Sequence, residues 1–74
     1  MEVLLFGMLA EKAGTSRLEV EAGTLADLRR SMAERIPGLH HIDHVIAVDR
    51  VIVHDDRTLT GREEIALLPP FAGG

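Results

Sequence analysis

The residues best placed for chemistry are the last two, Gly73 and Gly74. Without side chains they give the chain end a very small cross-section, and glycine adopts backbone conformations that other residues cannot. Such an end can enter a narrow channel in a partner, and the carboxylate of Gly74 is open to approach from every side. A carboxylate reacts with nucleophiles only after it gains a good leaving group. The chemistry that these residues predict is acyl activation of the chain terminus.

The alternative is that Gly73 and Gly74 are a frayed end or a remnant of engineering, since disorder and processing concentrate at termini. The two preceding prolines favour the functional interpretation. Proline fixes φ and has no N–H for a sheet ladder. We therefore expect Pro69 and Pro70 to end a strand and to hold a flexible C-terminal tail (about residues 70–74) away from the body.

Conventional catalytic groups are few. Ser16 and Ser31 have no flanking nucleophile motif. The acidic pairs Asp55-Asp56 and Glu63-Glu64 could act as general acid and base, but neighbouring residues of a strand point to opposite faces, and charged residues are mostly solvated. The sequence predicts that the chain is not an enzyme on its own.

Three of the four histidines, His40, His41 and His44, fall in one predicted loop and could bind a metal. No cysteine or carboxylate completes a closed site at a familiar spacing. Surface histidines are the simpler interpretation, so we expect no metal and no permanently bound cofactor, and the role of residues 40–44 stays open.

Composition limits the classes of protein that fit. Seventy-four residues make one domain, residues 1–74, with one core. The absence of cysteine suits a reducing compartment, and no apolar run approaches the roughly 20 residues of a membrane span, so we expect a cytoplasmic protein that does not contact a membrane. The net charge of −4 argues against nucleic acid as a partner and favours a protein surface.

Hydrophobic periodicity predicts five strands and one main helix. The helix is capped by Thr24, carries its apolar stripe on Leu25, Leu28, Met32 and Ile36, and ends at Pro37-Gly38. Residues 8–13 are expected to form a short helical connector outside the core. The strands are expected at residues 2–7, 17–21, 45–48, 51–53 and 65–68. The expected fold is α+β, with a mixed sheet of four to five strands and one helix on one face.

The first and last strands are the most apolar, so we expect them side by side, with residues 2–7 buried on both sides. Period-two alternation assigns Val3, Leu5, Ile65 and Leu67 to the face beneath the helix. It assigns Leu4, Phe6, Ala66 and Leu68 to the other face, where no second helix is available. With Phe71 they are predicted to form an exposed apolar patch, which usually marks a protein interface.

Four segments together resemble a known family. They are V-L-L-F-G-x-L-A-x-x-A-G from Val3, the capped helix T-L-A-D-L ending at P-G-L, the A-V hairpin at residues 47–53, and E-x-A-L-L-P-P-x-x-G-G from Glu64. They resemble the small subunit of molybdopterin synthase, a ubiquitin-like β-grasp sulfur carrier. The resemblance covers nearly the whole chain, and its ending is the most specific part.

The resemblance implies a chemistry and a set of partners. An E1-like adenylyltransferase would use ATP to adenylate Gly74, and a sulfur donor system would convert the adenylate to a thiocarboxylate. The tail would enter the large subunit of a heterotetrameric synthase, and the sulfur would pass to the cyclic pyranopterin precursor. Gly73 would be the slim approach to the reacting group. The partner contacts would be Phe6, Leu68, Pro69, Pro70 and Phe71.

Two turns depart from the family pattern, and they affect turn geometry and partner choice. The hairpin reads Val48-Asp49-Arg50, where the family usually has V-N followed by a polar residue or glycine. Before the last strand, the family's G-D-E-V is replaced by Gly61-Arg62-Glu63-Glu64-Ile65. Other possibilities are a sulfur carrier for thiamine, tRNA thiolation or an amino acid, or a β-grasp binding module whose tail is not activated. The segment Leu68-Pro69-Pro70-Phe71 disfavours the thiamine branch.

Overall fold

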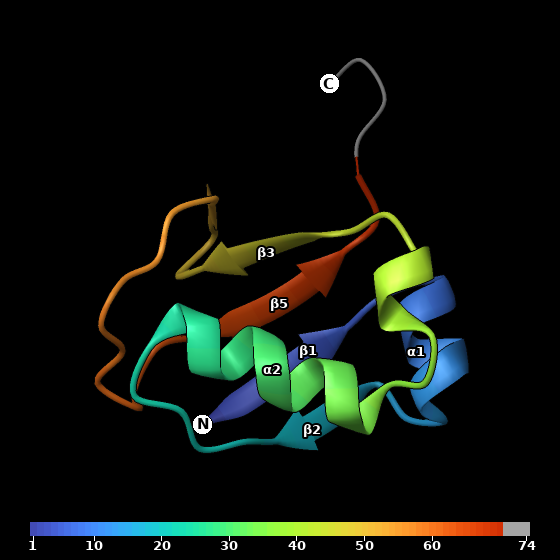
Figure 1. The fold of residues 1–74 in the computed structure, drawn as a ribbon, viewed down its shortest axis with the longest axis horizontal. Coiled ribbons are helices and arrows are strands. Elements are labelled where there is room, and N and C mark those ends of the chain that lie inside the picture. The colour runs from blue at the N-terminus through green and yellow to red at the C-terminus, as the bar shows by residue number, and fades with distance from the viewer. Residues whose placement is uncertain (71–74) are drawn as a thin grey trace.

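The computed structural model describes residues 1–70, and residues 71–74 lie outside the described part. The elements are β1 (Glu2–Leu5), α1 (Met8–Ala13), β2 (Arg17–Glu19), α2 (Leu25–Arg35), the 3₁₀ helix η1 (Leu39–His41), β3 (Val45–Val48), β4 (Val51–Val53) and β5 (Ile65–Leu68). The five strands form one sheet in the order β2-β1-β5-β3-β4, and α2 crosses one face of it (Figure 1).

The sheet is mixed, as the sequence predicted. β1 and β5 are parallel neighbours, with Val3 opposite Ile65 and Leu5 opposite Leu67, while the other three pairings are antiparallel. The expected α+β fold, with one main helix on one face of a five-stranded sheet, is confirmed. Within residues 1–70, the structure has no helix of the length and hydropathy that a bilayer crossing requires.

α2 begins where its first amides find acceptors. Thr24 Oγ1 accepts from the amide of Asp27 at 3.1 Å, as predicted. The amide of Leu25 donates to the carbonyl of Arg57, and that of Ala26 donates to Asp56 Oδ1, both at 2.9 Å. These bonds satisfy the N–H groups that the first turn of a helix leaves open, and they tie the loop after β4 to the helix.

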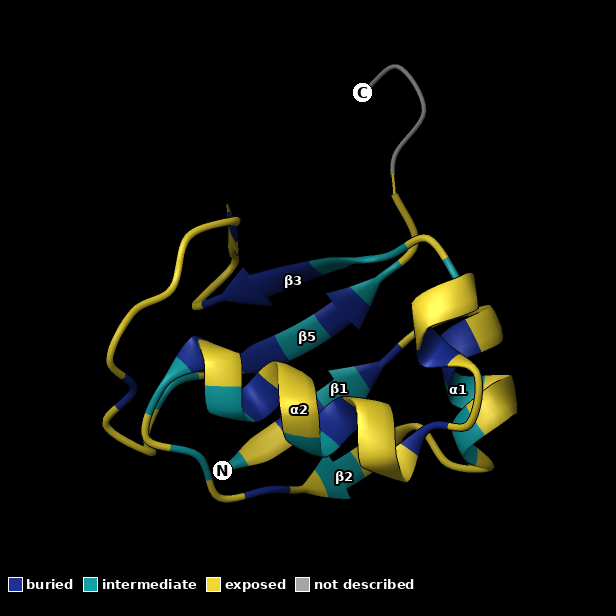
Figure 2. Cartoon of the chain, viewed as in Figure 1, coloured by how far each residue is buried: buried dark blue, intermediate teal, exposed yellow. Residues whose placement is uncertain are grey.

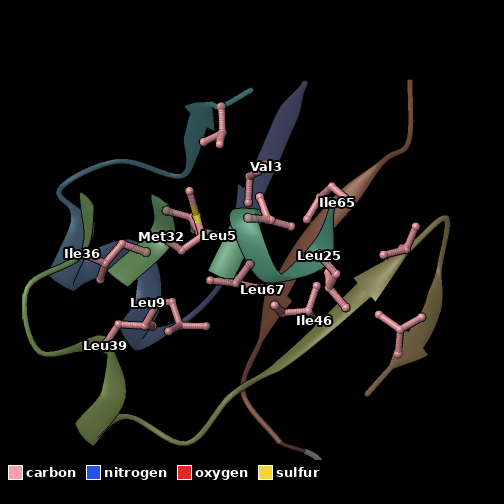
Figure 3. Close-up of a cluster of buried hydrophobic side chains, with 14 of the residues drawn as sticks. Val3, Leu5, Leu9, Leu25, Met32, Ile36, Leu39, Ile46, Ile65 and Leu67 are labelled. Atoms are coloured by element: carbon pink, nitrogen blue, oxygen red, sulfur yellow. The ribbon is translucent and has the colours of Figure 1, made fainter. Parts of the chain in front are cut away.

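The core lies between α2 and the sheet (Figure 3). The four stripe residues of the helix and their counterparts on the sheet are at most 3% exposed, which confirms the predicted inner face. Burial of each such side chain stabilises the fold by about 1.5–3 kcal/mol. The inner face consists of Val3, Leu5, Ile65 and Leu67 on the strands, and Leu25, Leu28, Met32 and Ile36 on or next to α2.

Two predictions about connecting segments were wrong. α1 lies where the short helix was expected, and Gly14 ends it at a φ of 76°, but Leu9 is only 1% exposed and belongs to the core. The predicted loop of residues 39–44 begins with η1, whose Leu39 is also buried. Both segments therefore extend the core beyond the end of α2.

The turn between β3 and β4 is built from two residues with positive φ, Asp49 at 50° and Arg50 at 70°. Asp49 is held by a two-point contact with the start of β5. Its amide donates to the carbonyl of Glu64 at 2.8 Å, and its carboxylate Oδ1 accepts from the amide of Glu64 at 2.9 Å. The predicted hairpin is confirmed, and these bonds, with the tolerance of aspartate for positive φ, stand in for the usual glycine.

Candidate functional site: the open face of the sheet

In the described part of the chain, the face of the sheet opposite α2 has no covering element. Leu4, Ala66 and Leu68 are half-buried there, and Phe6 is 45% exposed. In Figure 2, β5 alternates between buried and intermediate residues along its length. The expectation that residues 2–7 are buried on both sides was wrong, because only one face of β1 has a layer packed on it.

The open face, as we call it, surrounds a shallow hollow of about 410 Å³. It combines the predicted patch residues with others from β3, β4, their turn and the residue before β5. The lining consists of Leu4, Phe6, Ala47, Arg50, Ile52, Glu64, Ala66 and Leu68. An apolar centre of this kind with charged residues at its margin is typical of a protein interface.

Sequence reasoning missed Ala47 and Ile52 as members of this face. Ala47 lies opposite Ala66 of β5 and opposite Ile52 of β4 in the strand register. Period-two alternation along the hairpin would have placed both residues on one face. Joining that face to Leu4 and Leu68 required knowledge that β3 pairs with β5.

Two exposed ion pairs stand at the margins of the open face. Arg17 Nη1 lies 3.4 Å from Glu2 Oε2 on the β2 side, and Arg50 Nε lies 3.4 Å from Glu64 Oε1 on the β4 side. Exposed pairs of this kind contribute about 0–1 kcal/mol to stability. Their effect on the fold is therefore small, and their positions bracket the apolar strip.

The chain leaves β5 beside Phe6. The amide of Phe6 donates to the carbonyl of Leu67 at 3.3 Å, β5 ends at Leu68, and Pro69 is exposed. Gly7 turns the chain into α1 at a φ of 58°, and a Cβ built on Gly7 would lie 3.3 Å from Pro69 Cγ. Glycine at position 7 thus permits both the turn and the close approach of the proline.

The predicted site residues divide into two groups. Phe6, Leu68, Pro69 and Pro70 lie together at the end of β5, with Phe6 and Leu68 in the hollow and both prolines exposed. Phe71, Gly73 and Gly74 lie outside the described residues.

Of the acidic groups considered for catalysis, Glu63 is engaged in hydrogen bonds to the backbone of the preceding turn. Its carboxylate accepts from the amides of Thr60 at 2.8 Å and Gly61 at 2.9 Å. These backbone hydrogen bonds, that from Thr60 first, hold the pKa of Glu63 below its ordinary value of 4.5. Asp56 accepts from the amide of Ala26 at the start of α2, as described above. Glu63 and Asp56 therefore both have structural roles, as acceptors for backbone amides.

In the histidine segment, residues 40–44, His40 and His41 are exposed and His44 is half-buried. The rings of His40 and His41 lie 4.0 Å apart between centroids. His44 Nδ1 is 2.7 Å from the carbonyl of Ile42, and since a carbonyl can only accept, Nδ1 carries the proton. In residues 1–70, no three histidine, aspartate or glutamate side chains come together as a set that could hold a metal ion.

The five-stranded mixed sheet with the main helix α2 on one face is the β-grasp fold of small ubiquitin-like proteins. Solved structures agree. Small archaeal modifier protein 1 of H. volcanii superposes with a TM-score of 0.82 at 23% identity, covering 96% of this chain and 97% of that one. At that identity the likeness shows the fold alone. A chain from the protein–protein complex of subunits 1 and 2 of molybdopterin-converting factor from Helicobacter pylori gives a TM-score of 0.72 at 26% identity, covering 99% and 96%.

Sequence comparison identifies the family. The chain matches the ThiS family over residues 3–74. It is also 34% identical to the molybdopterin synthase sulfur carrier subunit of Escherichia coli (strain K12), over all of this chain and 99% of that protein. The chain belongs to the ThiS family.

Proposed function

We propose that this protein is the sulfur carrier subunit of a molybdopterin synthase. The observation that carries the proposal is the match to the Escherichia coli carrier, which spans both proteins almost from end to end at 34% identity. It includes the segment Leu67–Gly74, in which two glycines follow two prolines. The open face beside the end of β5 supplies a surface on which partner proteins can dock.

The proposed chemistry takes place at the carboxylate of Gly74. A carboxylate oxygen attacks the α-phosphorus of ATP on an E1-like adenylyltransferase, and pyrophosphate leaves. Sulfide delivered by the donor system then attacks the acyl carbon and displaces AMP, and loss of a proton leaves a thiocarboxylate. Its sulfur attacks a side-chain carbon of the cyclic pyranopterin precursor on the large subunit, and the carbon–oxygen bond at that carbon breaks as the oxygen substituent leaves. Water then hydrolyses the resulting thioester, which leaves the sulfur on the precursor and returns the carboxylate of Gly74. This chain binds no cofactor permanently in the cycle.

The large subunit and the adenylyltransferase are proposed to use the same open face in turn. Phe6 and Leu68 would be the apolar anchors, because they flank the point where the chain leaves β5. Pro69, Pro70 and Phe71 would guide Gly73 and Gly74 toward the partner's active site. The structure of molybdopterin-converting factor subunits 1 and 2 as a complex supports a partner of this kind.

The test is intact mass spectrometry of the protein taken from its native cell, followed by reconstitution. We expect a fraction in which one oxygen at Gly74 is replaced by sulfur, and this fraction should make molybdopterin when mixed with the large subunit and the precursor. A variant with one alanine added after Gly74 is the control, and it should carry no sulfur. A native protein that never carries sulfur would contradict the proposal. If the sulfur passes only to a thiamine precursor, tRNA or an amino acid, the protein is a sulfur carrier but not the molybdopterin synthase subunit.

A further inference from the structure

Arg50 is the second residue of the two-residue turn between β3 and β4, a turn that requires a positive φ at both positions and usually has glycine or asparagine there. Its φ of 70° lies in the left-handed region, where residues other than glycine, asparagine and aspartate are uncommon. The neighbouring Asp49 has a φ of 50° but makes two hydrogen bonds of 2.8 and 2.9 Å to Glu64. For Arg50, among residues 1–70, the structure gives one side-chain hydrogen bond, from Nε to Glu64 Oε1 at 3.4 Å.

That contact does little for stability. The side chain of Arg50 is 88% exposed and that of Glu64 is 48% exposed, and a pair this open to water is worth little. The hairpin accounts for the backbone conformation of Arg50, but neither the turn nor this ion pair accounts for an arginine side chain at a position that glycine or asparagine fits better. Arg50 lines the hollow of the open face together with Ile52, so its charge stands at the margin of the apolar strip.

The contact with Glu64 uses Nε of Arg50 and leaves the two terminal nitrogens, Nη1 and Nη2, available. A guanidinium carries five N–H donors. Glu64 engages Nε, and the structure gives neither Nη1 nor Nη2 of Arg50 a hydrogen-bond partner within residues 1–70. These two groups form the fork that binds a carboxylate with two parallel hydrogen bonds. Glu64 thereby orients Arg50 without filling the fork.

The ion pair at the other margin differs in this respect. Arg17 lies within β2 and directs Nη1, one arm of its own fork, to Glu2 at 3.4 Å. Arg50 stands on a turn, beyond the ends of β3 and β4, where a partner can reach it from outside the sheet. Of the two arginines at the margins, Arg50 is therefore the better placed to receive a carboxylate.

We propose that Arg50 is a specificity-determining residue of the docking face, and that its fork binds a carboxylate side chain on the large subunit while the partner's apolar groups fill the hollow. The inference rests on the proposed function for the identity of that partner. Exclusion of water by the docked apolar groups strengthens a charged hydrogen bond. A single charged contact at the margin fixes the orientation of the complex more than it adds to hydrophobic affinity.

The experiment measures binding of the full-length protein to the large subunit from the same cell, by calorimetry and by association kinetics at low and high salt. Arg50→Asn removes the charge and suits the positive φ, so the variant should fold at least as well as wild type. We expect its dissociation constant to rise about tenfold. Its association rate should also depend less on salt than that of wild type.

Two further variants separate the explanations. Arg50→Lys keeps the charge but loses the fork, and it should still bind several-fold more weakly than wild type. Arg30→Gln makes the same change in net charge on α2, on the opposite side of the sheet, where Arg30 pairs with Asp27 at 3.2 Å. It should bind as wild type does.

Wild-type binding by either Arg50 variant, or equal losses in the Arg30 and Arg50 variants, would overturn the inference. Failure of the wild-type protein to bind the large subunit at all would instead count against the proposed function. The two failures are thus distinguishable in one set of measurements.

Discussion

Leu67 and Leu68 are neighbours in β5 with the same side chain and opposite surroundings. Leu67 is fully buried beneath α2, whereas Leu68 is half-buried and lines the hollow of the open face. Successive residues of a strand point to opposite faces, so this pair separates what holds the fold together from what meets a partner.

We expect the two alanine variants to fail in different assays. Leu67→Ala should lower the free energy of unfolding by about 2–5 kcal/mol, because it leaves a cavity in the core. Leu68→Ala should change stability by less than about 1 kcal/mol and weaken binding to the large subunit by about 1–3 kcal/mol. Urea denaturation and calorimetry measure the two effects. Equal destabilisation by both variants, or wild-type affinity of Leu68→Ala, would contradict this assignment.

At the level of single residues, alternation and helical spacing were sufficient where one element decides the answer. They placed Val3, Leu5, Ile65 and Leu67 beneath the helix and Phe6 and Leu68 on the open face. They were insufficient for Ala47, Ile52 and Arg50, whose membership in the same face depends on the pairing of β3 with β5. That pairing joins segments about 20 residues apart and leaves no periodic signal in either one.

Among the elements, the turn that leads into β5 is held by one carboxylate. Glu63 accepts from the amides of Thr60 and Gly61, at distances of 2.8 to 3.1 Å. The charged form is the better acceptor, which is why the pKa of Glu63 in the fold lies below its ordinary value of 4.5. The contribution of Glu63 to stability is therefore fully present above about pH 5 and declines as the pH falls through its lowered pKa.

Glu63→Gln should change how the stability of the fold depends on pH. The amide keeps the shape of the side chain but cannot ionise, so the variant should be less stable than wild type at neutral pH. The difference should shrink as the pH falls below 4.5 toward the lowered pKa of Glu63. Denaturation midpoints measured from pH 7 to about pH 3 test this sign. Glu34→Gln, on the exposed side of α2, is the matched control. A difference that grows on acidification would show the assignment to be wrong.

The elements that sequence patterns predicted best were the ones with enough residues to show a period. α2 has eleven residues and a full apolar stripe, and its boundaries and buried side agree with expectation. α1 has six residues and η1 three, too few for periodicity to reveal that Leu9 and Leu39 are buried. Leu9 and Leu39 are buried because they pack against the core formed by α2 and the sheet, and that contact is a property of the tertiary structure.

For the whole molecule, the proposed function divides the chain into a folded body and a reactive tail. The buried core of the described residues begins at Val3 and ends at Leu67, and β5 ends at Leu68. The proposed chemistry, in contrast, is confined to Gly74. If this division is correct, stability and sulfur transfer depend on different segments and can be removed separately.

A chain that ends at Pro70 tests the division. Because the core lies within residues 3–67, we expect this truncated protein to fold with a melting temperature within about 4 °C of wild type, the shift that corresponds to roughly 1 kcal/mol in a domain of this size. It should form no adenylate with the E1-like enzyme and ATP, and no molybdopterin in the reconstituted system.

Leu28→Ala is the complementary control. It keeps Gly74 but opens a cavity beneath α2, so it should lose about 2–5 kcal/mol of stability and still accept sulfur wherever it remains folded. Molybdopterin synthesis by the truncated chain would contradict the assignment of the chemistry to Gly74, and unfolding of the truncated chain would contradict the independence of the body.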